Sequence, residues 1–206
     1  ESSSVTEYLE DKKRQLLDSI RLEQQRIRKI EIAMRDFKES TIETHYNVTI
    51  KSVPGCKILS LRKTVADYYC EGRLWEQLYA FVREEQIKLS PGTNNLAIYH
   101  NGGTTEDGVD IEVGVMVERE GADKGGFCYR ETEAVEDMAC IMVYGPYENI
   151  GLSYHAFACW MEEHSQYEIA GPSRQICHIG SWDESDSQKF LTEVQTPVRR
   201  ILTLTP

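Results

Sequence analysis

The chain has 206 residues, of which 40% are hydrophobic and 28% are charged, and its 34 acidic and 23 basic residues give a net charge of −11. This composition argues against disorder, and since no apolar run approaches the roughly 18 residues of a membrane span, we expect no transmembrane helix. No secretory signal opens the chain, and because it begins with Glu1 rather than Met we expect a fragment of a longer protein.

A long helix is predicted for residues 1–40. No Gly or Pro occurs from Thr6 to Lys38, and apolar residues recur at alternating spacings of four and three. Such a heptad pattern is typical of a helix that packs along another, and about 33 residues would extend for roughly 50 Å. We therefore predict a coiled-coil helix that forms a homodimer; a helix folded back on its own domain is the alternative. The residues expected at the dimer interface are Leu16, Ile20, Ile27, Ile30 and Met34.

The net charge falls entirely on the second part of the chain. Residues 1–40 carry nine basic and nine acidic residues, which leaves 14 basic and 25 acidic residues in 41–206. A body this acidic repels phosphate backbones and attracts cations. We therefore predict two domains, 1–40 and 41–206, and no nucleic-acid binding by this chain alone.

Residues 41–206 show short β-rich runs and two amphipathic helices, arranged as two similar halves. The first half is predicted to have strands at 47–53, 56–65, 95–100 and 110–118 and a helix at 72–88. The second half is predicted to have strands at 128–134, 138–144, 174–179 and 190–198 and a helix at 147–164.

The two halves also match residue by residue in places. Ile111-Glu112-Val113 corresponds to Thr192-Glu193-Val194, 81 residues later. The predicted fold class is therefore α+β: a duplicated domain of two β-β-α-β-β halves with one antiparallel sheet and both helices on one face. The cleft between the halves is the expected ligand site.

Aromatic residues are the first candidates for that site. Ten of the eleven tyrosines lie after residue 40. Aromatic rings form apolar walls whose faces attract organic cations, although ordinary core packing is the alternative and is favoured for Phe157 and Trp160. The candidate ligand-binding rings are Tyr68, Trp75, Tyr79, Tyr99, Tyr144, Tyr147 and Tyr154.

Two matched pairs of polar residues are the next candidates. Strand alternation places Glu112 and Glu193 opposite their Ile and Val neighbours. If that face carries the cleft, a ligand cation would relieve the cost of burying each carboxylate; a solvated outer face is the alternative. His100 and His178 are also matched, but without a third ligand at metal spacing they are interpreted as structural, and no metal site is expected.

The six cysteines are scattered singly, without C-x-x-C spacing. Free thiols are typical of a reducing compartment, so the pattern favours a cytoplasmic protein.

Four sequence blocks resemble the GyrI-like effector-binding domain over roughly residues 46–198. A long helix directly before such a domain is similar to the dimerisation helix of MerR-type multidrug-sensing transcription regulators, in which a helix-turn-helix domain comes first and is missing from this chain. The blocks are Gly145-Pro146-Tyr147-Glu148, Trp160-Met161-Glu162-Glu163, Tyr167-Glu168-Ile169-Ala170-Gly171-Pro172 and Leu191-Thr192-Glu193-Val194-Gln195-Thr196-Pro197-Val198.

The resemblance implies a cytoplasmic, homodimeric sensor without enzymatic activity or cofactor. Its aromatic pocket, with an acidic floor, would bind bulky hydrophobic and often cationic drugs, and it would reach DNA only through the missing helix-turn-helix domain. Tyr147 and Glu193 lie in matching blocks. Where relatives commonly have Arg-Glu-Ile-Tyr, this chain has Arg174-Gln175-Ile176-Cys177, so Gln175 and Cys177 replace an acid and a ring of the ligand site.

Two other functions remain open. GyrI-like hydrolases act on reactive cyclopropane-containing compounds, and they need the acid and the tyrosine that this chain lacks at 175 and 177 to activate water. A protein that only scaffolds through its coiled coil would show neither binding nor turnover.

Overall fold

The computed structural model describes residues 9–10, 12–17, 20, 27, 46–90, 95–100 and 108–201. The chain divides into two compact units, Glu1–His45 and Tyr46–Pro206. The described residues of the first unit are all helical, whereas Ile30 and Met34 of the predicted heptad lie outside the described residues. None of the described helices is long and apolar enough to cross a membrane.

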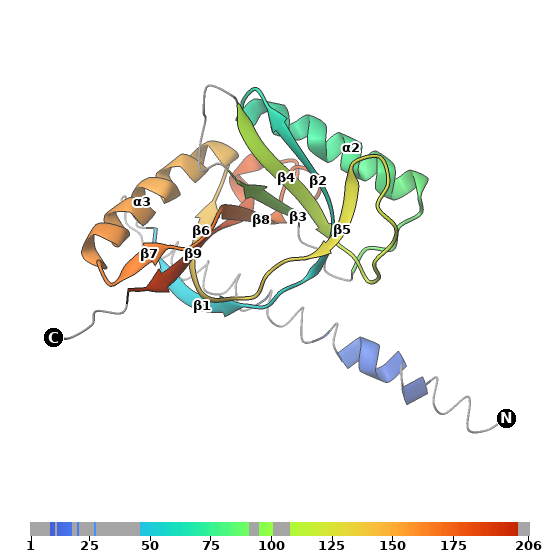
Figure 1. The fold of residues 1–206 in the computed structure, drawn as a ribbon, viewed down its shortest axis with the longest axis horizontal. Coiled ribbons are helices and arrows are strands. Elements are labelled where there is room, and N and C mark those ends of the chain that lie inside the picture. Colours follow the sequence, from blue (N-terminus) through green and yellow to red (C-terminus); the bar gives the residue numbers. More distant parts are fainter. Residues whose placement is uncertain are drawn as a thin grey trace. The chain divides into compact units, whose positions relative to one another are not determined.

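The second unit is built on an antiparallel sheet (Figure 1). Among its described residues there are two α-helices, α2 (Glu71–Glu84) and α3 (Ile150–Glu163), and three 3-10 turns, η1 (Tyr68–Cys70), η2 (Tyr147–Asn149) and η3 (Ser187–Lys189). The nine strands of this described part are β1 (Thr49–Val53), β2 (Lys57–Val65), β3 (Asn95–Tyr99), β4 (Val109–Met116), β5 (Phe127–Glu131), β6 (Val135–Tyr144), β7 (Tyr167–Ile169), β8 (Ser173–Ile179) and β9 (Leu191–Arg200).

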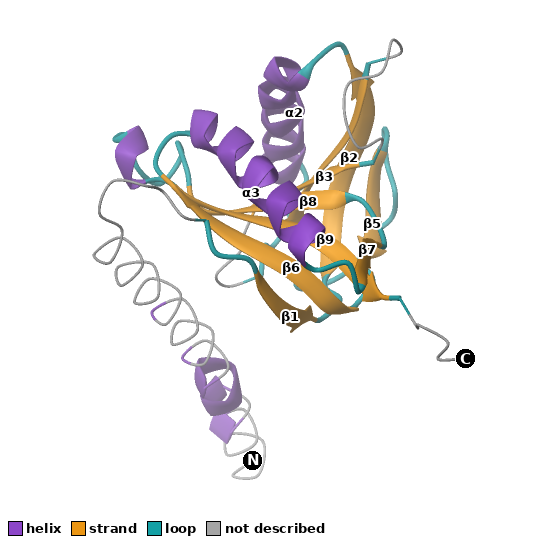
Figure 2. Ribbon diagram, turned by 90° about the vertical axis from the view of Figure 1, so that its left-hand side faces the viewer, coloured by secondary structure: helices purple, strands orange, loops and turns teal. Residues whose placement is uncertain are grey.

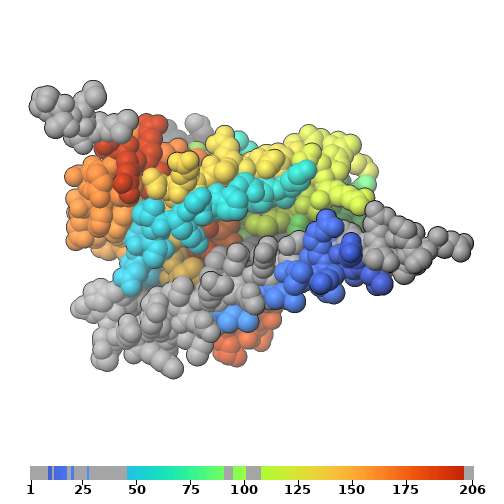
Figure 3. Space-filling view, turned by 90° about the horizontal axis from the view of Figure 1, so that it is seen from below, coloured from blue at the N-terminus to red at the C-terminus, as the bar shows by residue number. Residues whose placement is uncertain are grey.

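The strands follow the order β1-β6-β9-β8-β3-β4-β2-β5 along the sheet, and β7 pairs with β9. Strands β3 and β8 are neighbours in the middle. Strands β4, β2 and β5 follow on one side, and β9, β6 and β1 follow on the other. The early strand β1 therefore pairs with β6, and β5 pairs back with β2. Figure 3 shows this exchange from below, where β1 and the start of β2 run beside the β5–β6 segment.

Both helices cover the same face of the sheet (Figure 2), which we call the helix face. Helix α2 buries Leu74, Leu78 and Val82, spaced four residues apart, against β2 and β4. Helix α3 packs through Phe157 on β6 and β9. Each helix thus closes one of two core clusters on this face.

The opposite side of the sheet is called the far face. Because side chains alternate along a strand, Ile111 and Val113 of β4 lie in the core under α2, and Glu112 between them points to the far face. A smaller apolar cluster on the far face contains Ile58 and Ile176.

The predicted α+β class with an antiparallel sheet is confirmed, and both predicted helices are present. Helix α2 ends at Glu84, earlier than the predicted residue 88. Gln86 has a positive φ of 52°, a left-handed conformation that ends the helix. The short strand Tyr167–Ile169 was not predicted, and its three residues are too few to show an alternating pattern.

Candidate ligand-binding site

Six aromatic side chains from η1, α2, β3, α3 and the loop after β8 gather on the helix face, and we call them the aromatic cluster: Tyr68, Trp75, Tyr79, Tyr99, Tyr154 and Trp182. The ring centroids of Tyr68 and Tyr99 lie 5.6 Å apart. Trp182, in the loop after β8, lies 5.9 Å from Trp75 and 6.3 Å from Tyr79. The cluster thus joins α2 to the loop that follows one of the two central strands.

The aromatic cluster is buried at its base and open at its rim. Tyr99 is 5% exposed, whereas Tyr68 and Trp182 are 44% and 46% exposed. Tyr79 donates a hydrogen bond to the side chain of Asn95 on β3, which holds its ring over the sheet. Rings that are anchored at one end and exposed at the other can contact a flat apolar ligand without unfolding their surroundings.

The acidic residue of this cluster is Glu71, the first residue of α2. Trp75 Nε1 donates to its Oε1 at 2.9 Å, and the Tyr99 hydroxyl donates to its Oε2 at 2.8 Å. The four-residue spacing from Glu71 to Trp75 places the two side chains on one side of the helix. All of these hydrogen-bond donors are neutral, and no described residue forms an ion pair with Glu71.

Burial governs the protonation of this group. Burial raises the pKa of Glu71, and the hydrogen bonds from Trp75 and Tyr99 offset that rise only in part. Burial and the neighbouring carboxylate raise the pKa of Tyr99 well above its ordinary value, so its hydroxyl keeps its proton and remains a donor. A positive charge beside Glu71 would therefore stabilise its ionised form.

The β8 side of the cluster carries the two residues that depart from the GyrI-like pattern. Gln175 donates to the Tyr154 hydroxyl at 3.4 Å, and Cys177 Sγ lies 3.8 Å from the Tyr147 hydroxyl. Burial raises the pKa of Cys177 to about 11 and that of Tyr147 to about 12. Both groups are therefore neutral near pH 7 and act as hydrogen-bonding groups rather than as charges.

The turn after β8 needs glycine. A Cβ atom at Gly180 would lie 2.6 Å from Cys177 Sγ and 2.8 Å from the Tyr147 hydroxyl. The same Cβ atom would lie 3.2 Å from the Trp182 ring, so the side chains of Cys177, Tyr147 and Trp182 all crowd this position.

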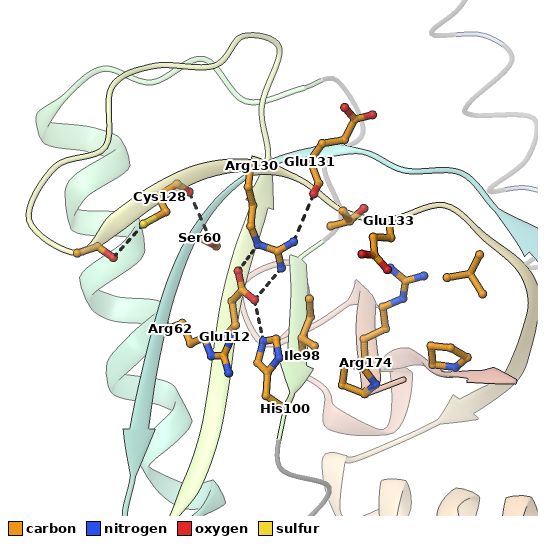
Figure 4. Close-up of a pocket in the computed structure, with 15 residues that line it drawn as sticks. Ser60, Arg62, Ile98, His100, Glu112, Cys128, Arg130, Glu131, Glu133 and Arg174 are labelled. Atoms are coloured by element: carbon orange, nitrogen blue, oxygen red, sulfur yellow. Dashed lines mark hydrogen bonds and ion pairs between the residues drawn. The ribbon is translucent and has the colours of Figure 1, made fainter. Parts of the chain in front are cut away.

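Glu112 lies on the far face and is bound by an arginine and a histidine (Figure 4). Arg130 of β5 donates two hydrogen bonds to it, both at 2.7 Å, and His100 Nε2 lies 2.8 Å from its Oε2. Burial alone would raise the pKa of Glu112, but the hydrogen bonds from Arg130, Ser60 and His100 outweigh burial and lower it to about 2. This carboxylate is ionised at neutral pH and is already paired.

Glu193 repeats this arrangement on the other half of the sheet. It is fully buried, it forms an ion pair with Lys51 of β1, and His178 Nε2 lies 2.9 Å from its Oε2. Gln195 donates a further hydrogen bond at 3.1 Å. Burial lowers the pKa of Lys51, but the adjacent Glu193 more than compensates and raises it, so the lysine stays charged.

Residues 46–199 match the family of GyrI-like small molecule binding domains. The chain belongs to the GyrI-like family. A search of curated protein sequences found no match.

Solved structures show where this GyrI-like fold recurs. The C-terminal domain of EcmrR, a MerR-family regulator, is 23% identical with a TM-score of 0.65, over 76% of this chain and 99% of that chain. EcmrR in complex with DNA gives 23% identity and a TM-score of 0.71, over 88% of this chain and 70% of that chain.

Two more distant structures are each 10% identical. SAV2435 bound to tetraphenylphosphonium has a TM-score of 0.54, over 74% of this chain and 94% of that chain. A hydrolase encoded by lin2189 from Listeria innocua has a TM-score of 0.52, over 74% of this chain and 92% of that chain. These likenesses show the fold.

Within the GyrI-like domain, most of the predicted aromatic residues lie together. Five of them belong to the aromatic cluster, and Tyr147 adjoins it through Cys177. Tyr144 does not belong to it. Strand alternation puts Tyr144 on the far face with Met142, opposite the buried Ile141 and Val143.

The expectation that Glu112 or Glu193 would lie beneath the aromatic rings is wrong. Both side chains point to the far face, because their neighbours Ile111, Val113 and Val194 lie in the core on the helix face. The charges of Glu112 and Glu193 are compensated within the protein, by Arg130 and Lys51 respectively, so neither needs a ligand cation. His100 and His178 are structural partners of these acids, as interpreted from the sequence.

Sequence reasoning missed Glu71 and Trp182. An acid four residues before a tryptophan at a helix start was a signal for Glu71, since that spacing lets an indole N–H reach a carboxylate. Trp182 lies in an irregular loop, and no periodic pattern places its ring.

Proposed function

We propose that this GyrI-like domain binds bulky hydrophobic cations at the aromatic cluster and serves as the ligand-sensing part of a MerR-like transcription regulator. One observation carries the proposal: Glu71 is held among aromatic rings by Trp75 and Tyr99, and no described residue supplies it with a cation. A ligand cation would complete this arrangement.

The physical reason is the state of the carboxylate without a ligand. Burial raises the pKa of Glu71 and so disfavours its ionised form. A bound cation would stabilise the ionised carboxylate, and it would also contact the faces of the surrounding rings. Each cation–π contact contributes roughly 0.5–2 kcal/mol, and burying aromatic ligand surface adds to that. The distant relative SAV2435, bound to tetraphenylphosphonium, indicates a suitable probe.

The test compares two probes of the same shape and opposite charge. Tetraphenylphosphonium and tetraphenylborate are titrated separately into the full chain by isothermal titration calorimetry, with Trp fluorescence as a second readout. We expect the cation to bind at least tenfold more tightly than the anion. Equal affinities, or no binding of the cation, would contradict a cation site at Glu71.

The role in transcription rests on the fold and on the charge distribution. EcmrR carries the same fold in a structure with DNA. The net charge of −11 disfavours DNA contact by this chain, so DNA would be bound by a helix-turn-helix domain outside this sequence. Ligand binding would then change the activity of the regulator only if the ligand has different affinities for two states of the protein.

The N-terminal arm is proposed to form a homodimer through its heptad positions. Leu16, Ile20 and Ile27 are each more than half exposed in the single chain. A second copy of the helix would cover them. Sedimentation of the double variant Ile20→Asp/Ile27→Asp should give monomers, while Lys12→Asp/Gln15→Asp, away from the heptad positions, should leave the dimer intact.

The domain is also inferred to be a duplicated unit. Strands β4, β2 and β5 and strands β9, β6 and β1 occupy corresponding places on the two sides of β3 and β8. Glu112 with His100 and Arg130 matches Glu193 with His178 and Lys51 in both position and chemistry. The exchanged strands β5 and β1 each supply the long-chain cation of one such group.

A hydrolase role is the alternative, since the lin2189 protein with this fold is called a hydrolase. At the position of the missing acid, Gln175 cannot act as a general base, and at the position of the missing tyrosine the Cys177 thiol has its pKa raised to about 11. We therefore propose binding without catalysis. Product formation from a cyclopropane-containing substrate at catalytic protein concentration would favour the hydrolase.

The protein is proposed to act in the cytoplasm. All six cysteines are free. Free thiols persist in a reducing compartment.

A further inference from the structure

A cavity lies on the far face of the sheet, and Figure 4 shows the residues that line it. Its volume is about 620 Å³. Its lining includes the apolar residues Ile98, Val135 and Pro197, the arginines Arg62, Arg130 and Arg174, His100, and the acids Glu112, Glu131 and Glu133. The strands that contribute these side chains include β3, β5, β6, β8 and β9, so the cavity extends over both halves of the sheet.

Arg174 is the unusual member of this lining. Its side chain belongs to β8, and the residue is only 7% exposed. Its Nε and Nη2 atoms are buried and have no hydrogen-bond partner in the described part of the chain. Gln195, directly opposite on β9, has a side-chain oxygen that also lacks a donor, so these two residues do not satisfy each other.

The nearby carboxylates do not compensate Arg174. Glu112 is paired with Arg130 and His100, and Glu193 is paired with Lys51 and His178. The acids at the edge of the cavity, Glu131 and Glu133, are exposed and form no ion pair with Arg174. A buried guanidinium without a counterion is costly, and burial lowers the pKa of Arg174.

We propose that the far-face cavity binds a small organic carboxylate, with its anionic group on Arg174 and its apolar body against Ile98, Val135 and Pro197. A guanidinium presents a planar fork that matches a carboxylate through two parallel hydrogen bonds. The apolar lining favours a ligand with a hydrocarbon body over a free inorganic anion. A cavity of this size holds a small molecule.

This second site is independent of the proposed cation site. The two sites lie on opposite faces of one sheet and prefer opposite charges, so failure of one proposal leaves the other standing. Tetraphenylphosphonium should not displace a carboxylate from the far-face cavity, and Glu71→Gln should leave carboxylate binding unchanged.

The experiment uses the full chain and two fluorinated probes of equal size. Binding of 4-(trifluoromethyl)benzoate and of the uncharged 4-(trifluoromethyl)benzamide is measured by ¹⁹F NMR titration. We expect the benzoate to bind at least tenfold more tightly, because hydrogen bonds to a buried charge are roughly worth that factor or more. Equal binding of the two probes, or no binding of the benzoate, would overturn the proposal.

Two arginine variants assign the site. Arg174→Met should weaken benzoate binding at least tenfold and leave benzamide binding unchanged. Arg62 also lines the cavity, but Asp110 already occupies its guanidinium with contacts of 3.0 and 2.6 Å, so Arg62→Met should change benzoate affinity by less than twofold. Undiminished benzoate binding by Arg174→Met would overturn the assignment.

The thermal stability of Arg174→Met separates a ligand site from a structural role. An uncompensated buried charge predicts that its replacement by methionine maintains or raises Tm, and that benzoate raises the Tm of the natural chain only. If the variant does not fold, the arginine Nε–Hε NMR resonances of the natural chain test whether benzoate contacts a buried arginine. Benzoate, but not benzamide, must shift a buried arginine resonance, and the absence of such a shift overturns the proposal.

Discussion

The helix face and the far face of the same sheet hold acids in opposite electrostatic situations, half-buried at Glu71 and buried at Glu112 and Glu193. On the far face, Glu112 and Glu193 each contact a long-chain cation and a histidine. On the helix face, Glu71 is held by an indole N–H and a tyrosine hydroxyl, both neutral. Burial of a carboxylate alone therefore does not point to a ligand site in this domain; our proposal rests on Glu71 having no cationic partner among the described residues.

The pKa directions express the same difference. Paired Glu112 has its pKa lowered to about 2, whereas burial raises the pKa of Glu71. The folded protein loses stability when Glu112 is protonated. The ionised form of Glu71 would be stabilised by a cationic partner. We therefore expect Glu112 and Glu193 to contribute to stability and Glu71 to contribute to cation affinity.

The largest expected effect is on stability, at Glu193. Glu193→Gln removes the partner of Lys51 from a fully buried position and should lower the free energy of unfolding by about 3 kcal/mol, measured by urea denaturation. Tetraphenylphosphonium affinity should change by less than twofold. Preserved stability together with lost cation binding would reverse the roles that we give to the two faces.

A smaller effect is expected at acidic pH, from Glu112. Its pKa is lowered in the folded state, so its stabilising contribution is fully present above its ordinary value of 4.5 and is lost as the pH falls towards 2. After discounting for solvent screening this contribution is about 2 kcal/mol. Urea denaturation of the natural chain and of Glu112→Gln from pH 6 to pH 2.5 should show the two stabilities converging, and parallel curves would contradict the pairing.

A smaller effect still is expected at the rim of the aromatic cluster. Tyr68→Leu removes a ring that lies against Tyr99 and should weaken tetraphenylphosphonium binding about fivefold, the value of one cation–π contact. Tyr69 is the matched control, because it is the adjacent tyrosine and is 96% exposed. Calorimetry should show Tyr69→Leu binding as the natural chain does. Equal effects of the two variants would place the ligand outside the cluster.

The sequence predicted the sheet, both helices and most of the aromatic cluster because these follow from periodic patterns over several residues. The recurrence of Glu112 at Glu193 was visible in the same way. Their true partners were not visible, because Arg130 and Lys51 come from strands that pair with the other half of the sheet. Chain order alone suggests pairing within each half.

The choice of the acidic residue failed for a related reason. Strand alternation gave Glu112 and Glu193 a common face, but it could not tell which face the helices cover. The four-residue spacing of Glu71 and Trp75 was a local signal, but the second contact of Glu71 comes from Tyr99, which is 28 residues later and lies over the start of α2. A contact between a helix terminus and a central strand depends on the tertiary packing, so local propensity could not predict it.

The central claim concerns the charge of Glu71, and the pH dependence of tetraphenylphosphonium affinity tests it most directly. Only ionised Glu71 attracts the cation, so affinity should be constant at high pH and fall as the pH is lowered through the raised pKa of this group. Glu71→Gln should bind weakly with no such pH dependence. The same pH dependence in the natural chain and in Glu71→Gln would contradict the account.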